Sequence, residues 1–289
     1  MSTSVTAKRR GRIGYFRPTQ AALYAVLIVL VFAYISPFII QIITSFKTEG
    51  DAANNPLALI PSPISLAAYA KLFAHSDFPL WIMNSVIVAV FVMAGRMVFD
   101  SMAGYALARL HYKGRNVVFA ALIAIMAVPS VALLIPKFLV ISQVLGIFNT
   151  YPGMILPFFA DATGVFIMKN FFESIPVAVE ESARVDGAST FRVYWSVVLP
   201  MATPALVTIG ILSFQGAWNE LQQMIASANK PALTVLSKGV ASLVSGQLGS
   251  GTQYPLKLAA ALMMTIPVAI VFFIFQKRIM NMSSGAVKE

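Results

Sequence analysis

Residues 18–46 read PTQAALYAVLIVLVFAYISPFIIQIITSF, and no charged residue lies between Arg17 and Lys47. A helix needs about 20 mainly apolar residues to cross the hydrocarbon layer of a membrane. This stretch therefore predicts a membrane-spanning helix over residues 20–45. The apolar core of a secretory signal peptide has only about 7–15 residues, so we interpret the stretch as a first span that the protein retains.

Similar charge-free runs occur five more times along the chain. Together, the runs predict spans at 20–45, 80–108, 117–140, 151–171, 203–225 and 257–276. Apolar residues are continuous within each run, whereas the strands of a membrane β-barrel alternate apolar and polar residues. We therefore expect an all-α polytopic membrane protein with six transmembrane helices. Its transmembrane domain occupies 20–276, between an N-terminal tail (1–19) and a C-terminal tail (277–289).

The composition excludes several other classes of protein. Hydrophobic residues make up 58% of the chain and charged residues 11%, whereas about a quarter of a soluble domain is charged. The chain contains no cysteine, which excludes disulfides and thiol chemistry. A net charge of +10 could indicate nucleic-acid binding, but basic cytoplasmic loops explain such a charge in a membrane protein. We therefore expect membrane lipid, and no nucleic acid, as a partner.

Lysine and arginine are divided unequally between the two sides of the predicted bundle. Fourteen lie on the side of the two tails, six lie on the other side, and Arg96 lies within the second span. Because basic residues concentrate in cytoplasmic loops, we expect both termini in the cytoplasm. The proline-rich connection 46–79 and the glycine-rich connection 226–256 would then be extracytoplasmic, the first extended and the second flexible.

The cytoplasmic segment 174–200 reads SIPVAVEESARVDGASTFRVYWSVVLP. Pro176 suits the first turn of a helix, where its missing N–H costs nothing, and Gly187 suits the left-handed position that ends one. Ser189 or Thr190 can cap a following helix. The pattern predicts two short helices that lie across the cytoplasmic face of the membrane. A plain connector is the alternative interpretation.

Several residues in this segment resemble the EAA motif of binding-protein-dependent ABC importer permeases. The matching residues are Glu181-Ser182-Ala183, Gly187 and Val197-x-Leu199-Pro200. The family pattern is Glu-Ala-Ala, three residues, Gly, nine residues and Ile-x-Leu-Pro, so the chain departs from it only at Ser182 and Val197, by small or conservative changes. Further matches follow in order along the chain, among them Asn84-Ser85, residues 103–110, Gly114-Arg115, residues 155–157, Trp218-Asn219 and residues 285–288. The set resembles the carbohydrate (maltose-type) subset, and is similar to the second permease subunit of those importers.

The resemblance implies a non-catalytic permease in the cytoplasmic membrane of a bacterium. The expected cargo is a sugar, either a di- or oligosaccharide or a related glycoside, delivered by an extracytoplasmic sugar-binding protein. The other expected partners are a second homologous permease subunit and a dimer of ATPase subunits. This chain is expected to bind no cofactor, because ATP and Mg²⁺ are used by the ATPase. The alternatives are ABC import of a glycerophosphodiester or polyol, and an ion-coupled secondary transporter.

The resemblance also assigns segment 174–200 to coupling with the ATPase. The implied coupling residues are Glu180, Glu181, Ser182, Ala183, Arg184, Asp186, Gly187, Ala188, Leu199 and Pro200. Glu181 would supply a charge for the ATPase surface, and the small Ser182 and Ala183 would allow a close approach. Gly187 would permit the bend between the two helices, whereas Asp186 has local capping or pairing as an equal alternative.

Polar residues within the predicted spans are candidates for the transport pathway. Arg96 and Asp100 are four residues apart on one helix face, so we expect them to pair directly, with contact to the substrate as the alternative. The substrate-pathway candidates are Asn84, Asp161, Trp218 and Asn219. Trp218 could stack on a sugar ring or serve as an interfacial anchor. The two histidines fall on opposite sides of the membrane, so no metal site is expected.

Overall fold

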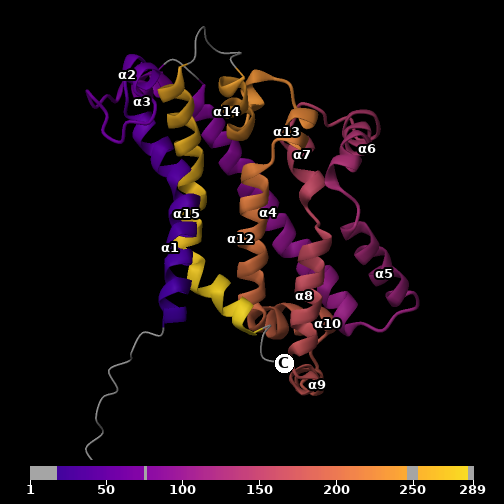
Figure 1. Cartoon of the computed structure of the whole chain (residues 1–289). Coiled ribbons are helices and arrows are strands. Elements are labelled where there is room, and N and C mark those ends of the chain that lie inside the picture. Colours follow the sequence, from indigo (N-terminus) through magenta and orange to yellow (C-terminus); the bar gives the residue numbers. More distant parts are fainter. Residues whose placement is uncertain (1–17, 75–76, 246–252, 286–289) are drawn as a thin grey trace, which may run out of the picture.

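A computed structural model of the chain describes residues 18–74, 77–245 and 253–285, and within these ranges every regular element is a helix (Figure 1). Three helices are individually long and apolar enough to cross a membrane: α1 (Pro18–Ser45), α4 (Phe78–Arg109) and α15 (Tyr254–Gly285). Three further spans result if each of three bent helix pairs counts as one span. The predicted all-α polytopic class is confirmed.

The third span is not the straight helix expected over residues 117–140. Helix α5 (Arg115–Met126) ends early, and the chain bends by 104° into residues 130–144. The second arm consists of η1 (Ser130–Leu133), α6 (Leu134–Leu139) and the π-helical η2 (Val140–Val144). Pro129 lies at the bend, and a proline disfavours helical backbone at the residue before it. Continuous hydrophobicity did not reveal this break.

The fourth and fifth spans are also bent. In the fourth, α7 (Tyr151–Ile155) and η3 (Leu156–Phe158) meet α8 (Ala162–Ser174) at 44°. In the fifth, a 79° bend separates residues 190–201 from α12 (Thr203–Asn219). Helix α12 ends at Asn219 rather than near residue 225, and the short α13 (Gln222–Ser227) follows. The apolar runs therefore do not show where the helices bend or, in the fifth span, where the helix ends.

The connections 46–79 and 226–256 contain more regular structure than the sequence indicated. The first holds α2 (Glu49–Asn54) and α3 (Ala67–Ala74), and the second holds η5 (Pro231–Leu233) and α14 (Leu236–Val244). The buried Lys47 fixes the first connection, because its Nζ donates to the backbone oxygen of Asn55 at 2.6 Å. The predicted C-terminal tail is helical as far as Gly285. Residues 1–17 and 286–289 of the predicted tails lie outside the described residues.

Helix α4 is the centre of the bundle and packs against both α8 and α12, whereas α1 pairs mainly with α15 (Figure 1). Small residues on α4 allow its close approach to α8. A Cβ added at Gly104 would lie 2.6 Å from the Cβ of Met168 and 2.9 Å from the backbone N of Lys169. Lipid tails are as apolar as the helix side chains, so the hydrophobic effect does not drive helices together within a membrane. Close van der Waals contact of this kind holds them together instead.

We predict that Gly104→Ala lowers the thermal stability of the purified protein, because the backbone of α8 must shift to admit the methyl group. The expected cost is about 1–3 kcal/mol. Gly216→Ala on α12 is the matched control, since nothing lies within 4 Å of the added Cβ and alanine favours the helix by about 1 kcal/mol. Equal melting temperatures for the two variants in one detergent would contradict the close α4–α8 packing.

Candidate functional site

Segment 174–200, which is predicted to couple to a partner, forms α9 (Val177–Val185) and α10 (Thr190–Val193). Gly187 has a φ of 79°, its N–H donates to Arg184 O, and Ala188 N–H donates to Ala183 O, both at 3.0 Å. These two bonds form the Schellman motif that ends many helices. The Ser189 side chain then accepts from the N–H of Arg192 and caps α10. The predicted helix–turn–helix is confirmed.

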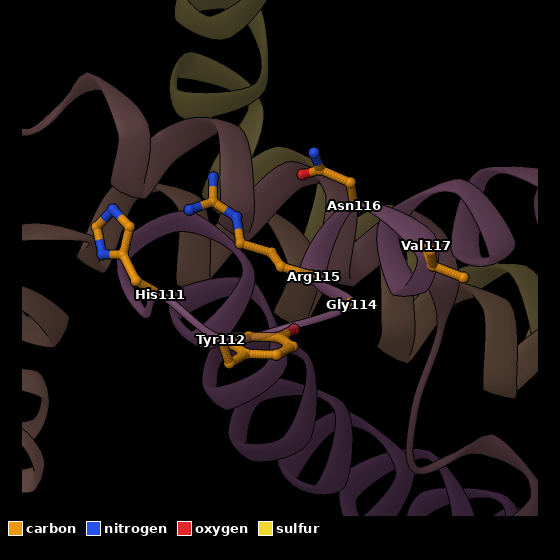
Figure 2. A pocket seen from close by; sticks show the side chains of 6 residues that line it. All are labelled: His111, Tyr112, Gly114, Arg115, Asn116 and Val117. Carbon is orange, nitrogen blue, oxygen red and sulfur yellow. The ribbon is translucent and has the colours of Figure 1, made fainter.

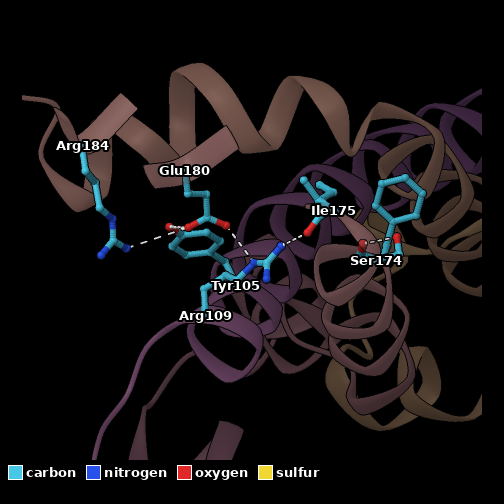
Figure 3. A network of polar contacts seen from close by, with 7 residues as sticks. Tyr105, Arg109, Ser174, Ile175, Glu180 and Arg184 are labelled. Carbon is cyan, nitrogen blue, oxygen red and sulfur yellow. Dashed lines mark hydrogen bonds and ion pairs between the residues drawn. The ribbon is translucent and has the colours of Figure 1, made fainter. Parts of the chain in front are cut away.

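The buried carboxylate of Glu180 attaches α9 to the inner end of α4 (Figure 3). Its Oε1 lies 2.7 Å from Arg109 Nε, and its Oε2 accepts from the Tyr105 hydroxyl at 3.0 Å. Arg109 also donates to the backbone oxygen of Ile175, just before α9 begins. Both charged side chains are largely shielded from solvent, at 10% and 4% exposure. The position and tilt of α9 are therefore set by α4.

A second contact of Glu180 is weaker. Arg184 on the next turn of α9 reaches Oε2 only at 3.9 Å, and its side chain is half exposed. Exposed pairs of this type contribute roughly 0–1 kcal/mol because water screens them. Arg109 and Tyr105 are therefore the structural partners of Glu180.

The opposite face of the segment is open and apolar. Glu181 is exposed, although its neighbour Glu180 is buried, because successive helical residues point about 100° apart. Val185 is 88% exposed and Phe191 65% exposed, and the Phe191 ring stacks on Trp195, which is itself exposed. Large exposed apolar groups beside polar ones are typical of a protein interaction surface.

The remaining coupling residues divide between the two faces. Ala183, Ala188 and Leu199 pack against the inner core around Tyr105 and Phe172. The exposed members are Ser182, Arg184, Asp186, Gly187 and Pro200. Asp186 occupies the C-cap of α9. Leu199 and Pro200 belong to α11 (Leu199–Met201), which follows the π-helical η4 (Tyr194–Val198) and leads to the bend before α12.

The predicted direct pair between Arg96 and Asp100 is wrong. Arg96 Nε donates to the backbone oxygen of Phe158 at 2.8 Å, and Asp100 Oδ1 accepts from the backbone N–H of Asp161 at 2.8 Å. These backbone groups lie at the break between η3 and α8, where helical hydrogen bonding is interrupted. A freed backbone group inside a membrane must find another partner, and the two α4 side chains supply it.

Two of the four substrate-pathway candidates belong to the core instead. Asn84 is 0% exposed; its Nδ2 donates to the backbone oxygens of Ala232 and Thr234, and its Oδ1 accepts from the Tyr151 hydroxyl. Trp218 is 1% exposed, and its Nε1 donates to Met264 O at 3.0 Å. In this conformation neither side chain can reach a solute, and Trp218 is not an interfacial anchor.

The other two candidates are accessible. The Asp161 side chain is partly exposed and caps α8 by accepting from Gly164 N–H at 3.2 Å. Asn219 is exposed at the end of α12. A direct contact of Asp161 or Asn219 with a solute stays a prediction.

Sequence reasoning missed Tyr105 and Arg109 as the residues that hold α9. Both residues belong to the run 103–110 that resembles the family, and Arg109 is also one of the charges that orient the chain, but the sequence assigns neither a contact with α9. The available signal was weak: a tyrosine and an arginine four residues apart share one face at the end of a span. Their partner Glu180 is 71 residues from Arg109 in the sequence, so the fold alone identifies the pairing.

Comparison with known proteins shows similarity over nearly the whole chain. Residues 100–280 match the family described as "Binding-protein-dependent transport system inner membrane component". The chain is 33% identical, over 100% of both sequences, to the sulfoquinovosyl glycerol transport system permease protein of Agrobacterium fabrum. It is also 33% identical to the trehalose transport system permease protein of Mycobacterium tuberculosis, covering 93% of this chain and 98% of that protein. A chain in the crystal structure of a bacterial ABC transporter involved in the import of the acidic polysaccharide alginate is 26% identical, with a TM-score of 0.79 and coverage of 95% and 99%.

We predict that the Arg109–Glu180 pair behaves as one unit in unfolding. Glu180→Gln leaves a buried arginine without its counter-charge and should lower the unfolding free energy by about 3–5 kcal/mol. Arg109→Met should cost a similar amount, and the double variant should cost less than the sum. The exposed neighbour gives the control: Glu181→Gln should change stability by no more than about 0.5 kcal/mol. Additive losses in the thermal cycle would show that the two charges act independently.

Proposed function

Because this chain belongs to the family of binding-protein-dependent transport system inner membrane components, we propose that it is one of two permease subunits through which an ABC importer moves a saccharide. The named relatives support a sugar, since they transport sulfoquinovosyl glycerol and trehalose. Family membership also argues against an ion-coupled secondary transporter. The permease carries no catalysis of its own, and a separate ATPase dimer uses ATP and Mg²⁺.

The proposed mechanism depends on the two faces of segment 174–200, one exposed and one attached to α4. The face with Glu181, Val185 and Phe191 is exposed and suits docking to the ATPase, with Glu181 as the charged contact. The opposite face is fixed to α4 through Glu180 and Arg109. When the ATPase dimer closes on ATP, α9 moves with it. The ion pair then transmits that motion to α4, and the spans change from inward-facing to outward-facing.

The arrangement of the chain ends agrees with this orientation. The start of α1 and the end of α15 lie at the same end of the bundle as α9 (Figure 1). We assign this end to the cytoplasm because the sequence places fourteen lysines and arginines on the side of the two tails and six on the other. The opposite end, with α2, α3 and α14, then receives the sugar-binding protein. Asp161 and Asn219 are the accessible polar residues that we assign to the pathway.

We predict that coupling depends on the charge at residue 181 and on the turn at residue 187. Glu181→Lys reverses an exposed charge at the docking face. Gly187→Val forces a left-handed backbone on a branched residue, at a cost of roughly 1–2 kcal/mol. Both variants should insert in the membrane but lose most ATPase during purification and most uptake by the reconstituted complex. Gly187→Asn is the control, because asparagine tolerates this conformation and an added Cβ meets no atom within 4 Å.

The same uptake assay identifies the cargo. The panel contains disaccharides, oligosaccharides and glycosides, together with a polyol and a glycerophosphodiester, each offered with the cognate binding protein. Uptake of a saccharide by the wild type, and its loss in Glu181→Lys, is the expected result. Uptake of only the polyol or the phosphodiester would disprove the sugar assignment while leaving the importer intact. Wild-type uptake by Glu181→Lys with Gly187→Val would disprove the coupling assignment.

We predict that α9 faces the cytoplasm and that the loop between α2 and α3 faces outward. Cysteine labelling of intact cells tests this orientation, since the native chain has no cysteine that would react. Leu59→Cys, in the exposed loop between α2 and α3, should react with an impermeant maleimide from outside. Ser174→Cys, at an exposed residue just before α9, should react only after the cells are opened. The reverse pattern would invert the topology.

A further inference from the structure

The turn that joins α4 to α5 encloses a groove that the transport mechanism does not use (Figure 2). The groove has a volume of about 530 Å³. It is lined by His111, Tyr112, Gly114, Arg115, Asn116 and Val117. Figure 2 shows the Arg115 and Asn116 side chains directed to one side of the turn and the Tyr112 ring beneath Gly114. Imidazole, guanidinium and amide groups therefore meet around one small space.

The positive charge of this turn is incompletely neutralised. Arg115 approaches Glu173 only at 3.9 Å, which is too long for a hydrogen bond. Both oxygens of Glu173 already accept from Lys169 at 2.8 Å. Lys113 is exposed in the same turn, and the sequence has no acidic residue between Asp100 and Asp161. The groove therefore has cationic donors available for an anion.

The groove lies where apolar surface meets the polar end of the bundle. None of the residues of α5, all of which the structure describes, is buried. Val117 is 72% exposed and Val118 50% exposed, immediately beside the lining residues. The turn lies at the same end of the bundle as α9 and α10, with α9 projecting further outward (Figure 1). Tyrosine is enriched at this depth of a membrane, where a ring with one polar end is well accommodated, and Tyr112 lies there.

We propose that this groove binds the phosphate headgroup of an anionic phospholipid from the inner leaflet. The Arg115 guanidinium presents planar donors that match phosphate oxygens, and Asn116 adds a further donor. Lys113 does not line the groove, but it is exposed in the same turn and adds positive charge beside it. The acyl chains lie along the exposed valines at the start of α5. Basic pockets at the cytoplasmic ends of spans commonly hold such headgroups. An acidic protein surface would satisfy the cations but would leave the valines against water.

The test measures which lipids the assembled importer retains when it is embedded in nanodiscs. Nanodiscs contain phosphatidylcholine alone or a mixture with phosphatidylglycerol, and native mass spectrometry counts the lipids that remain on the complex. The wild type should retain phosphatidylglycerol in preference to phosphatidylcholine. Lys113→Gln with Arg115→Gln should weaken that preference by about fivefold for each charge removed. Lys230→Gln removes one charge at an exposed residue of the opposite side, which matches the single variant Lys113→Gln, and it should leave the preference unchanged.

The single variant Lys113→Gln is included in case the double variant misfolds. Its side chain is exposed and makes no contact that the fold requires among the described residues. An unchanged lipid preference in both variants would overturn the proposal. A second arm adds inorganic phosphate to lipid-free detergent samples. Equal thermal stabilisation by phosphate and by phosphatidylglycerol, lost in both variants, would assign the groove to soluble phosphate and reject the lipid. Loss of the ATPase with an unchanged lipid preference would identify a protein-docking surface and also reject it.

Discussion

The ion pair between Arg109 and Glu180 is the contact on which the position of α9 depends. Burying two charges is expensive, and an apolar pair of similar volume is often as stable. Its value therefore lies in position rather than in stability. Glu180 accepts from Tyr105 and faces Arg109, both on α4, so α9 can satisfy its buried charge in only one orientation. That orientation leaves Glu181, Val185 and Phe191 facing outward.

The bent spans impose a second constraint on α4. At the break between η3 and α8, backbone groups lose their helical partners within the membrane. Arg96 and Asp100 bond to the carbonyl of Phe158 and the amide of Asp161 at this break. Charges inside a span are usually interpreted as a pair or as a substrate site. Here they support the backbone of a neighbouring span, which explains why two ionisable residues lie in the middle of α4.

The sequence predicted the features that depend on local physics. Apolar runs located the spans, because crossing the membrane requires a minimum length of apolar helix. Gly187 and Ser189 were recognisable because caps need particular residue types at fixed positions. The sequence could not predict contacts between distant segments, such as Asn84 with residues 232–234 or Trp218 with Met264. Bends were also hidden, since hydropathy is insensitive to backbone direction.

Helix α4 connects the two ends of the molecule as a single rigid element. It has 32 residues and is thus about 48 Å long. At its inner end, Arg109 holds α9. At its outer end, Asn84 and Ser85 hold the loop that leads into α14, where Ser85 Oγ accepts from Leu236 N–H at 2.7 Å. One continuous helix therefore carries both attachments, so α9 and the loop before α14 are fixed to the same element. In the mechanism proposed above, α4 would therefore link the two ends of the bundle directly, without a chain of intermediate side-chain rearrangements.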